Sequence, residues 1–154
     1  MSELKARLRS DLTAAMKSQD KLRINTVRML LAAIQTEEVS GKQARELSDD
    51  EVLKVLAREA KKRSESAEIY TQNGRGELAA EEHAEGRIID EYLPTQLSDA
   101  EVADVVDTAM AQVAEELGER PSVKQMGLVM KAAAAIAAGK ADGSRLSAAV
   151  KDRL

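Results

Sequence analysis

Apolar residues recur at helical spacing along most of the chain, and no stretch alternates in the manner of a β-strand. Four such patterns occupy about 2–17, 20–34, 48–72 and 77–93, and three more occupy about 98–117, 122–138 and 142–154. Each pattern places its apolar residues on one face of a helix, which favours packing against a shared core. The chain is therefore predicted to be all-α, with a four-helix N-terminal part followed by a compact three-helix C-terminal bundle.

Capping residues mark several of the predicted helix starts. Ser48 and Ser98 are each followed three residues later by glutamate, which is the capping-box pattern. Ser122 with Gln125 fits the same pattern, and Asp142 is suited to cap the last helix. At the other end of the helix that starts near Ser122, a glycine at position 139 stands where a C-cap glycine is expected.

The segment 94–97 is the predicted domain boundary. Pro94 disfavours helix at the residue before it and so ends the fourth helix. This boundary divides the chain into an N-terminal helical domain, residues 1–94, and a C-terminal tail-like domain, residues 95–154. The second part is small, yet within the size range that folds alone.

Composition narrows the classes of protein to which the chain can belong. It has no cysteine, which excludes disulfides and thiolate metal sites and suits a reducing compartment. No apolar run approaches the ~20 residues of a membrane span, and the N-terminus lacks a signal-peptide core. We therefore expect a cytoplasmic protein with no membrane partner. With Tyr70 and Tyr92 as the only aromatic residues, a stacking platform for single-stranded bases is nearly excluded.

The sign of the charge reverses within the C-terminal part. Residues 98–119 hold seven acidic side chains and no base, whereas residues 120–154 hold seven bases and two acids, a surplus of +5. Because the whole chain has a net charge of −4, a polyanion has to be met by such a local patch. The candidate phosphate ligands are Lys124, Lys131, Lys140, Arg145, Lys151 and Arg153, with Lys61 and Lys62 as secondary candidates. The alternative is that these charges only solvate the surface.

Two positions in this basic segment have competing interpretations. Lys140, Arg145 and the backbone N–H groups after Asp142 would suit an anion site at a helix N-terminus, unless Asp142 itself caps that helix. Gly127 lies in the first turn of its helix, where glycine costs about 1 kcal/mol relative to alanine. It serves either close approach of an RNA backbone or close helix–helix packing, and packing is the favoured interpretation.

Neither metal binding nor catalysis is indicated by the chain. His83 is the only histidine, and its acidic neighbours Glu81 and Glu85 do not complete a metal ligand set. No serine or threonine sits in a glycine-rich nucleophile elbow, and no glycine-rich loop is suited to cradle a phosphate. We expect no metal, no cofactor and no catalysis by this chain alone.

Five segments together resemble the YqeY-like family over essentially the whole chain. They lie at 23–34, 62–66, 91–98, 126–130 and 139–143. That family is similar to the tail domain of the B subunit of the tRNA-dependent amidotransferase, which acts on Asp- and Glu-tRNA, and to an extension on some glutaminyl-tRNA synthetases. The resemblance implies the four-plus-three helical arrangement and a tail that binds the outer body of tRNA and carries no active site. Leu128 stands where the family commonly has lysine, so one phosphate contact would be missing.

The sequence thus favours a non-catalytic tRNA-binding or tRNA-metabolism accessory protein that recognises RNA by shape and phosphate. The alternative is a protein-binding adaptor for an amidotransferase or an aminoacyl-tRNA synthetase, without direct RNA contact. A third interpretation, a DNA-binding helix-turn-helix at the C-terminus, lacks base-reading side chains over 144–151, so no DNA partner is expected.

Overall fold

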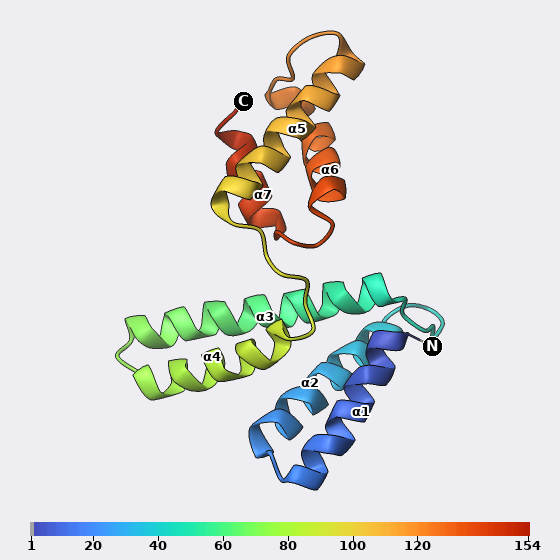
Figure 1. The fold of residues 1–154 in the computed structure, drawn as a ribbon, viewed down its shortest axis with the longest axis vertical. Coiled ribbons are helices and arrows are strands. Elements are labelled where there is room, and N and C mark those ends of the chain that lie inside the picture. Colours follow the sequence, from blue (N-terminus) through green and yellow to red (C-terminus); the bar gives the residue numbers. More distant parts are fainter. Residues whose placement is uncertain (1) are drawn as a thin grey trace. The chain divides into compact units, whose positions relative to one another are not determined.

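A computed structural model describes residues 2–154. These residues form seven α-helices and one 3-10 turn, with no β-strand among them (Figure 1). The elements are α1 (Glu3–Ser18), α2 (Lys21–Glu38), α3 (Asp49–Gln72), α4 (Gly76–Asp90), α5 (Asp99–Leu117), the 3-10 turn η1 (Val123–Gln125), α6 (Met126–Ala137) and α7 (Gly143–Lys151). The all-α prediction is confirmed for these residues. None of the described helices has the length and apolar character needed to cross a bilayer.

Contacts between residues divide the chain into two units, the first ending at Leu93 and the second beginning at Pro94. Helices α1–α4 belong to the first unit, and η1 with α5, α6 and α7 belongs to the second. Within the predicted linker, Leu97 is part of the second unit, because it packs against that unit's core and donates its N–H to the Lys140 carbonyl at 2.8 Å.

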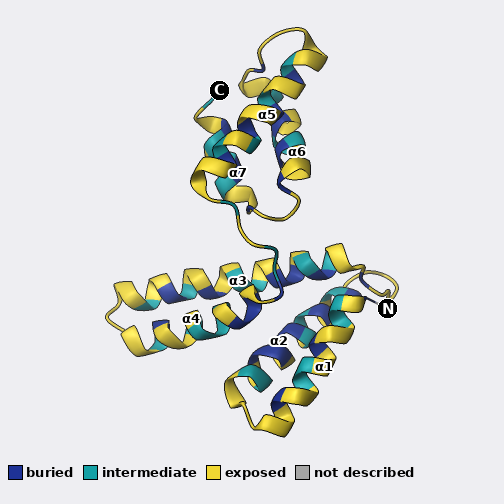
Figure 2. Ribbon diagram, viewed as in Figure 1, coloured by how far each residue is buried: buried dark blue, intermediate teal, exposed yellow. Residues whose placement is uncertain are grey.

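The first unit buries large aliphatic side chains between paired helices. Helices α1 and α2 lie side by side, as do α3 and α4 (Figure 1), and their buried faces turn toward one another (Figure 2). The core consists of Leu8, Val27, Leu30, Ile34, Leu47, Val52, Val55, Leu56, Ile89 and Tyr92. Burying a leucine or isoleucine contributes about 1.5–3 kcal/mol, so this core supplies the main stabilisation of the unit.

Polar contacts fasten the end of α4 to the first two helices. The Tyr92 hydroxyl donates to the Asp11 carboxylate, and the Arg7 guanidinium lies 4.6 Å from the centre of the Tyr92 ring. Burial raises the pKa of Tyr92 above its ordinary value, and the bond to Asp11 raises it further. Arg23 donates to both oxygens of Glu91, at 2.6 and 3.3 Å. These contacts join residues far apart in the sequence.

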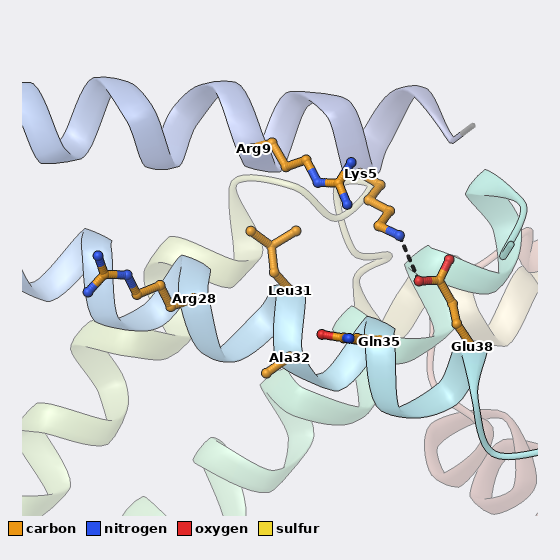
Figure 3. Close-up of a pocket in the computed structure, with 7 residues that line it drawn as sticks. All are labelled: Lys5, Arg9, Arg28, Leu31, Ala32, Gln35 and Glu38. Atoms are coloured by element: carbon orange, nitrogen blue, oxygen red, sulfur yellow. Dashed lines mark hydrogen bonds and ion pairs between the residues drawn. The ribbon is translucent and has the colours of Figure 1, made fainter. Parts of the chain in front are cut away.

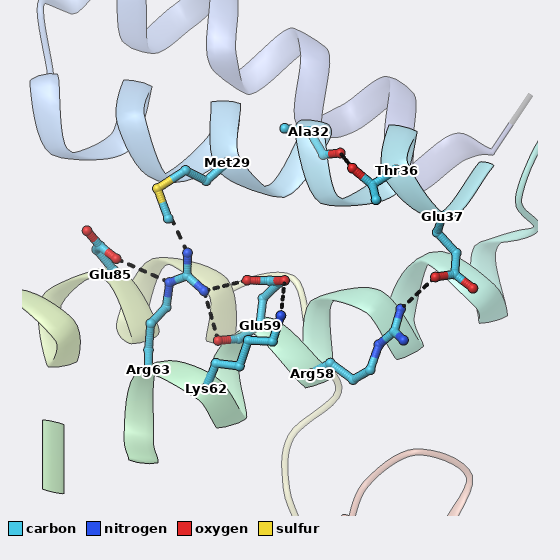
Figure 4. A network of polar contacts seen from close by, with 9 residues as sticks. All are labelled: Met29, Ala32, Thr36, Glu37, Arg58, Glu59, Lys62, Arg63 and Glu85. Carbon is cyan, nitrogen blue, oxygen red and sulfur yellow. Dashed lines mark hydrogen bonds and ion pairs between the residues drawn. The ribbon is translucent and has the colours of Figure 1, made fainter. Parts of the chain in front are cut away.

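A buried arginine links α2, α3 and α4 (Figure 4). Arg63 is 6% exposed and donates to the Glu59 carboxylate at 2.7 Å and to the Glu85 carboxylate at 3.2 Å. Its second terminal nitrogen lies 3.9 Å from the Met29 sulfur. Desolvation opposes ionisation of Glu59, but its bonds to Arg63 and Lys62 lower its pKa on balance. Because the carboxylates of Glu59 and Glu85 neutralise its charge, the Arg63 side chain can lie in the interior of the unit.

The second unit has a core of smaller side chains. Its buried members are Val102, Val106, Ala109, Val113, Val129, Ala133, Ala137, Ala141, Leu146 and Val150. Ile136 and Leu117 are large apolar side chains of α6 and α5, yet they are 37% and 39% exposed. Helix α6 packs on α5 and α7 through a narrow stripe with a spacing of four residues, and Ile136 lies outside that stripe.

The helix ends follow the predicted capping residues, with two corrections. The capping boxes at Ser48 and Ser98 are present, each with its glutamate. Ser122 donates its N–H to Gln125 at 2.8 Å, but the pair opens the turn η1 rather than α6 itself. Helix α6 ends at Ala138, which is left-handed with φ 50°, and not at the predicted glycine one position later. An L-residue in that conformation is strained by roughly 1–2 kcal/mol.

Candidate nucleic-acid interface

The outward side of α6 is made of small and apolar residues with one charge. Lys131 is the only charged side chain among the twelve residues Met126–Ala137. Val129, Ala133 and Ala137 are buried on the inner side. The exposed residues at helical spacing on the opposite side are Gly127, Leu128, Lys131, Ala134 and Ala135. A partner can therefore approach the backbone of this helix closely.

Packing within the chain does not account for Gly127. A methyl group at its Cβ position would meet no heavy atom within 4 Å beyond its own neighbours and helix backbone, and its φ is not in the left-handed region. The favoured prediction of close helix–helix packing at this glycine is wrong, because Gly127 faces outward. Alanine would be the better helix former at such a position.

The arginines of the second unit are used to hold its helices together. Arg145 pairs with Asp99 at 3.0 Å, which joins the start of α7 to the start of α5. Arg153 pairs with Asp107 and donates to the Ala149 carbonyl at 2.8 Å. Arg145 and Arg153, both predicted as phosphate ligands, thus already have partners inside the unit. Their contact with RNA stays a prediction.

The third arginine of the unit has a similar structural role. Arg120 precedes η1, and it donates to the Arg153 carbonyl at 3.0 Å. Because Arg153 lies just after α7, this bond holds the chain's last residues against the loop that follows α5. An arginine side chain can satisfy several acceptors at once, which suits these joining positions.

The lysines of the second unit are placed differently from its arginines. Lys124, Lys131, Lys140 and Lys151 are all exposed, and none makes a side-chain hydrogen bond or ion pair within residues 2–154. Lys124 belongs to η1 and Lys131 to α6, so they are not on one continuous helix as predicted, although η1 runs directly into α6. Lys124, Lys131 and Lys151 are therefore available to an anion, whereas the charge of Lys140 already acts on the Glu101 carboxylate and contributes to its lowered pKa.

The N-terminus of α7 is already capped. Asp142 accepts the N–H of Arg145 at 2.8 Å through its carboxylate, which occupies the position that an anion would need. Of the two interpretations of this segment, the ordinary cap is therefore the one observed. Lys140 is held nearby through its backbone, whose N–H donates to the Ala137 carbonyl at 3.0 Å.

Leu128 and the secondary candidates complete the set of predicted residues. Leu128 is 49% exposed beside Lys131, so its side chain adds little to the core. Lys61 and Lys62 are exposed on α3, and Lys62 pairs with Glu59 at 3.3 Å. Among residues 2–154, no three histidine, aspartate or glutamate side chains gather as they would around a metal ion. The arrangement suits electrostatic contact with a polyanion.

The sequence itself contains one indication of which face of α6 points outward. Gly127, Ala134 and Ala135 share a helix face with Lys131, and the single charge of this otherwise apolar helix marks that face as the outward one. The pairing of the arginines has no such local signal, since Arg145 and Asp99 are far apart along the chain.

Comparison with known proteins gives matches over most of the chain. The family described as Yqey-like protein has a sequence model that matches residues 5–154. Similar proteins include "Altered inheritance of mitochondria protein 41, mitochondrial" from Meyerozyma guilliermondii, 35% identical over 124 residues, which is 79% of this chain and 64% of that protein. The protein of the same name from Kluyveromyces lactis is 31% identical over 120 residues, 77% of this chain and 63% of the relative.

The relatives' names and the family model give different information about this chain. The matched segment spans less than two thirds of both relatives' own length. Their names place those proteins in mitochondria, so the expected cytoplasmic location of this chain stays a prediction. The match of the family model, by contrast, covers the chain from the third residue of α1 to the C-terminus. The chain belongs to the YqeY-like protein family.

Proposed function

We propose that this chain is a non-catalytic accessory protein of tRNA metabolism that binds the body of tRNA through its second unit. The contact surface, here called the α6 face, consists of Lys124, Gly127, Leu128, Lys131 and Ala135. The four-helix and three-helix units are proposed to fold separately, with the second unit as the RNA-binding module. Lys140 and Lys151 supply additional phosphate contacts.

The observation that carries this proposal is the open position of Gly127. Glycine there weakens the helix, and no neighbour within the chain needs the space. A sugar–phosphate backbone gains from the missing side chain, because the chain of phosphates comes closest to a helix where Cβ atoms are absent or small. Lys124 and Lys131 lie on either side of Gly127 in the sequence and supply the opposite charge.

The chemistry of the exposed bases also supports contact with phosphates. A lysine ammonium is a compact, mobile charge that meets a phosphate without demanding a fixed geometry. Recognition of this kind reads the shape and charge of folded RNA rather than the identity of its bases. With no Phe or Trp in the chain, single-stranded bases find few stacking partners.

A mobility-shift comparison of total tRNA, duplex DNA and poly-uridine tests the proposal. We expect tRNA to bind most tightly and poly-uridine most weakly. Equal affinity for all three nucleic acids, or no binding to any, would remove the RNA-body proposal.

The adaptor alternative rests on a different surface of the same unit. Asp104, Glu115 and Glu116 are exposed on α5 and form an acidic face suited to a basic protein surface. Replacing Asp104 and Glu115 by lysine would weaken binding to an amidotransferase or a synthetase while leaving RNA binding intact or stronger. The same pair of substitutions therefore separates the two functions.

A further inference from the structure

The first unit contains a groove that the function proposed above does not use. It lies between α1 and α2 and has a volume of about 370 Å³ (Figure 3). Its lining residues are Lys5, Arg9, Arg28, Leu31, Ala32, Gln35 and Glu38. Lys5 and Arg9 are one helical turn apart on α1, and the others follow helical spacing along α2. The groove is thus formed by one face of each helix.

The two helices that form the groove carry more bases than acids. Residues 3–38 contain seven lysines and arginines and five acids, a surplus of +2. The lining of the groove has the same surplus, because Lys5, Arg9 and Arg28 stand against Glu38. A polyanion that approaches the groove therefore meets a favourable potential.

The one carboxylate in the groove is already compensated. Lys5 donates to Glu38 at 2.6 Å, and the Leu47 N–H donates to the other carboxylate oxygen at 3.3 Å. The bond from Lys5, together with the Leu47 N–H and the charge of Arg9, holds the pKa of Glu38 below its ordinary value, so this carboxylate stays ionised. The Lys5 and Glu38 side chains are both largely buried. The exposed charges of the groove are those of Arg9 and Arg28.

The cations are distributed along the groove rather than gathered at one point. Figure 3 shows Arg9 and Lys5 reaching from α1 toward one end, while Arg28 lies toward the other end on α2, with Leu31 between them. The Arg28 guanidinium is 3.9 Å from the Met16 sulfur, a weak contact that leaves its remaining donors for a ligand. An elongated anion with several phosphates matches this spacing better than one small ion does.

We propose that the groove between α1 and α2 is a second phosphate-binding site, and that its ligand is the sugar–phosphate backbone of RNA. Arg9 and Arg28 bind phosphates at the two ends, the Gln35 amide donates between them, and Leu31 and Ala32 form the floor. The identity of the ligand rests on the proposed function, whereas the existence of a phosphate site does not.

Titration of the full chain with inorganic tripolyphosphate, followed by NMR, tests the site without RNA. We expect saturable shifts of the side-chain N–H signals of Arg9, Arg28 and Gln35. The signals of Arg75 and Arg120, which lie outside the groove, should stay unchanged. Absence of a saturable shift at the groove, or equal shifts at all arginines, would overturn the proposal whatever the chain does with tRNA.

The salt dependence of tRNA binding then identifies the source of the phosphate. The variant that combines Arg9→Ala with Arg28→Ala should lose two contacts, so the slope of log affinity against log salt becomes shallower by about 1.4 to 1.8. The matched control combines Lys42→Ala with Lys54→Ala, two exposed bases of the same unit outside the groove, and should keep the wild-type slope.

The two proposals fail in distinguishable ways. If wild-type chain binds tRNA tightly and the Arg9/Arg28 variant keeps the wild-type slope, RNA is not the ligand of the groove, and the second proposal is overturned alone. If wild-type chain shows no preference for tRNA, the proposed function fails. Tripolyphosphate shifts at the groove would then assign the site to a small phosphorylated ligand and overturn the RNA assignment.

Discussion

The two units use charged side chains for different purposes. In the first unit, apart from the groove residues Arg9 and Arg28, ion pairs hold helices together, and the most buried charge, Arg63, contacts two carboxylates. In the second unit, three arginines make the joining contacts, while four lysines make no side-chain hydrogen bond or ion pair among the described residues. The difference separates charges that maintain the fold from charges available to a partner.

The cores of the two units also differ, in the size of the side chains that fill them. Leucine and isoleucine fill the first core, whereas valine and alanine fill most of the second. Small side chains let α6 pack on its neighbours through a narrow stripe, so six of its twelve residues remain exposed. A helix with one charge in twelve residues and an open outer side is suited to a partner.

Removal of the buried arginine should give the largest effect on stability. Arg63→Met keeps most of the side-chain volume but removes the cation that joins Glu59 and Glu85, so Glu59 keeps only its pair with Lys62. We expect a loss of about 3 kcal/mol in the free energy of unfolding. Arg58→Met is the matched control, because its pair with Glu37 at 3.1 Å is exposed and should contribute less than about 1 kcal/mol. Urea titration of both variants measures the difference, and equal losses would contradict the distinction.

The limits of the second unit can be tested with two fragments. Residues 94–154 retain Leu97, which packs on the core and donates its N–H to Lys140, whereas residues 98–154 lack it. We expect both fragments to be helical and the longer one to be more stable by about 1–2 kcal/mol. Circular dichroism during urea titration compares them. Absence of helix in residues 94–154 would show that the units share one core.

The end of α6 offers a substitution that should stabilise the second unit. Ala138→Gly removes the strain of an L-residue at φ 50° and should raise the free energy of unfolding by about 1 kcal/mol. Ala135→Gly, three residues earlier in the same helix, should lower it by about 1 kcal/mol. Effects of the same sign in the two variants would contradict the assigned end of α6.

Substitution of the exposed Gly127 should change the stability of the unit and its RNA affinity in opposite directions. Gly127→Ala should stabilise the unit by up to about 1 kcal/mol, because the added methyl meets no neighbour. It should also weaken tRNA binding, because the methyl stands where the backbone of RNA approaches. Gly86→Ala in α4 is the control, since its Cβ position is equally open but lies on the other unit. It should stabilise without changing RNA affinity, and unchanged affinity in Gly127→Ala would remove the glycine from the interface.

Features set by neighbouring residues were predictable from the sequence, and features set by distant ones were not. Capping at Ser48, Ser98 and Asp142 depends on partners three residues away, so local spacing is sufficient. The outward direction of Ile136 depends on where α5 and α7 pack. Because nearly every residue of α6 is apolar, hydrophobic spacing gives that helix no preferred inner side.

The same distinction between neighbouring and distant residues applies to the candidate site. The basic character of residues 120–154 is a matter of composition and could be read directly. Which of its bases are paired depends on Asp99 and Asp107 of α5, each forty-six positions before the arginine it meets. The groove of α1 and α2 was missed because its two sides come from separate helices, and only the fold brings them together.

The most direct test of the central claim is the salt dependence of tRNA binding by a variant that combines Lys124→Glu with Lys131→Glu. If the α6 face binds RNA phosphates, affinity falls and the slope of log affinity against log salt becomes shallower by about 1.4 to 1.8. The variant that combines Lys61→Glu with Lys62→Glu should keep the wild-type slope. An unchanged slope in the first variant with a shallower one in the second would move the site to α3. An unchanged slope in both would contradict direct RNA binding through these lysines.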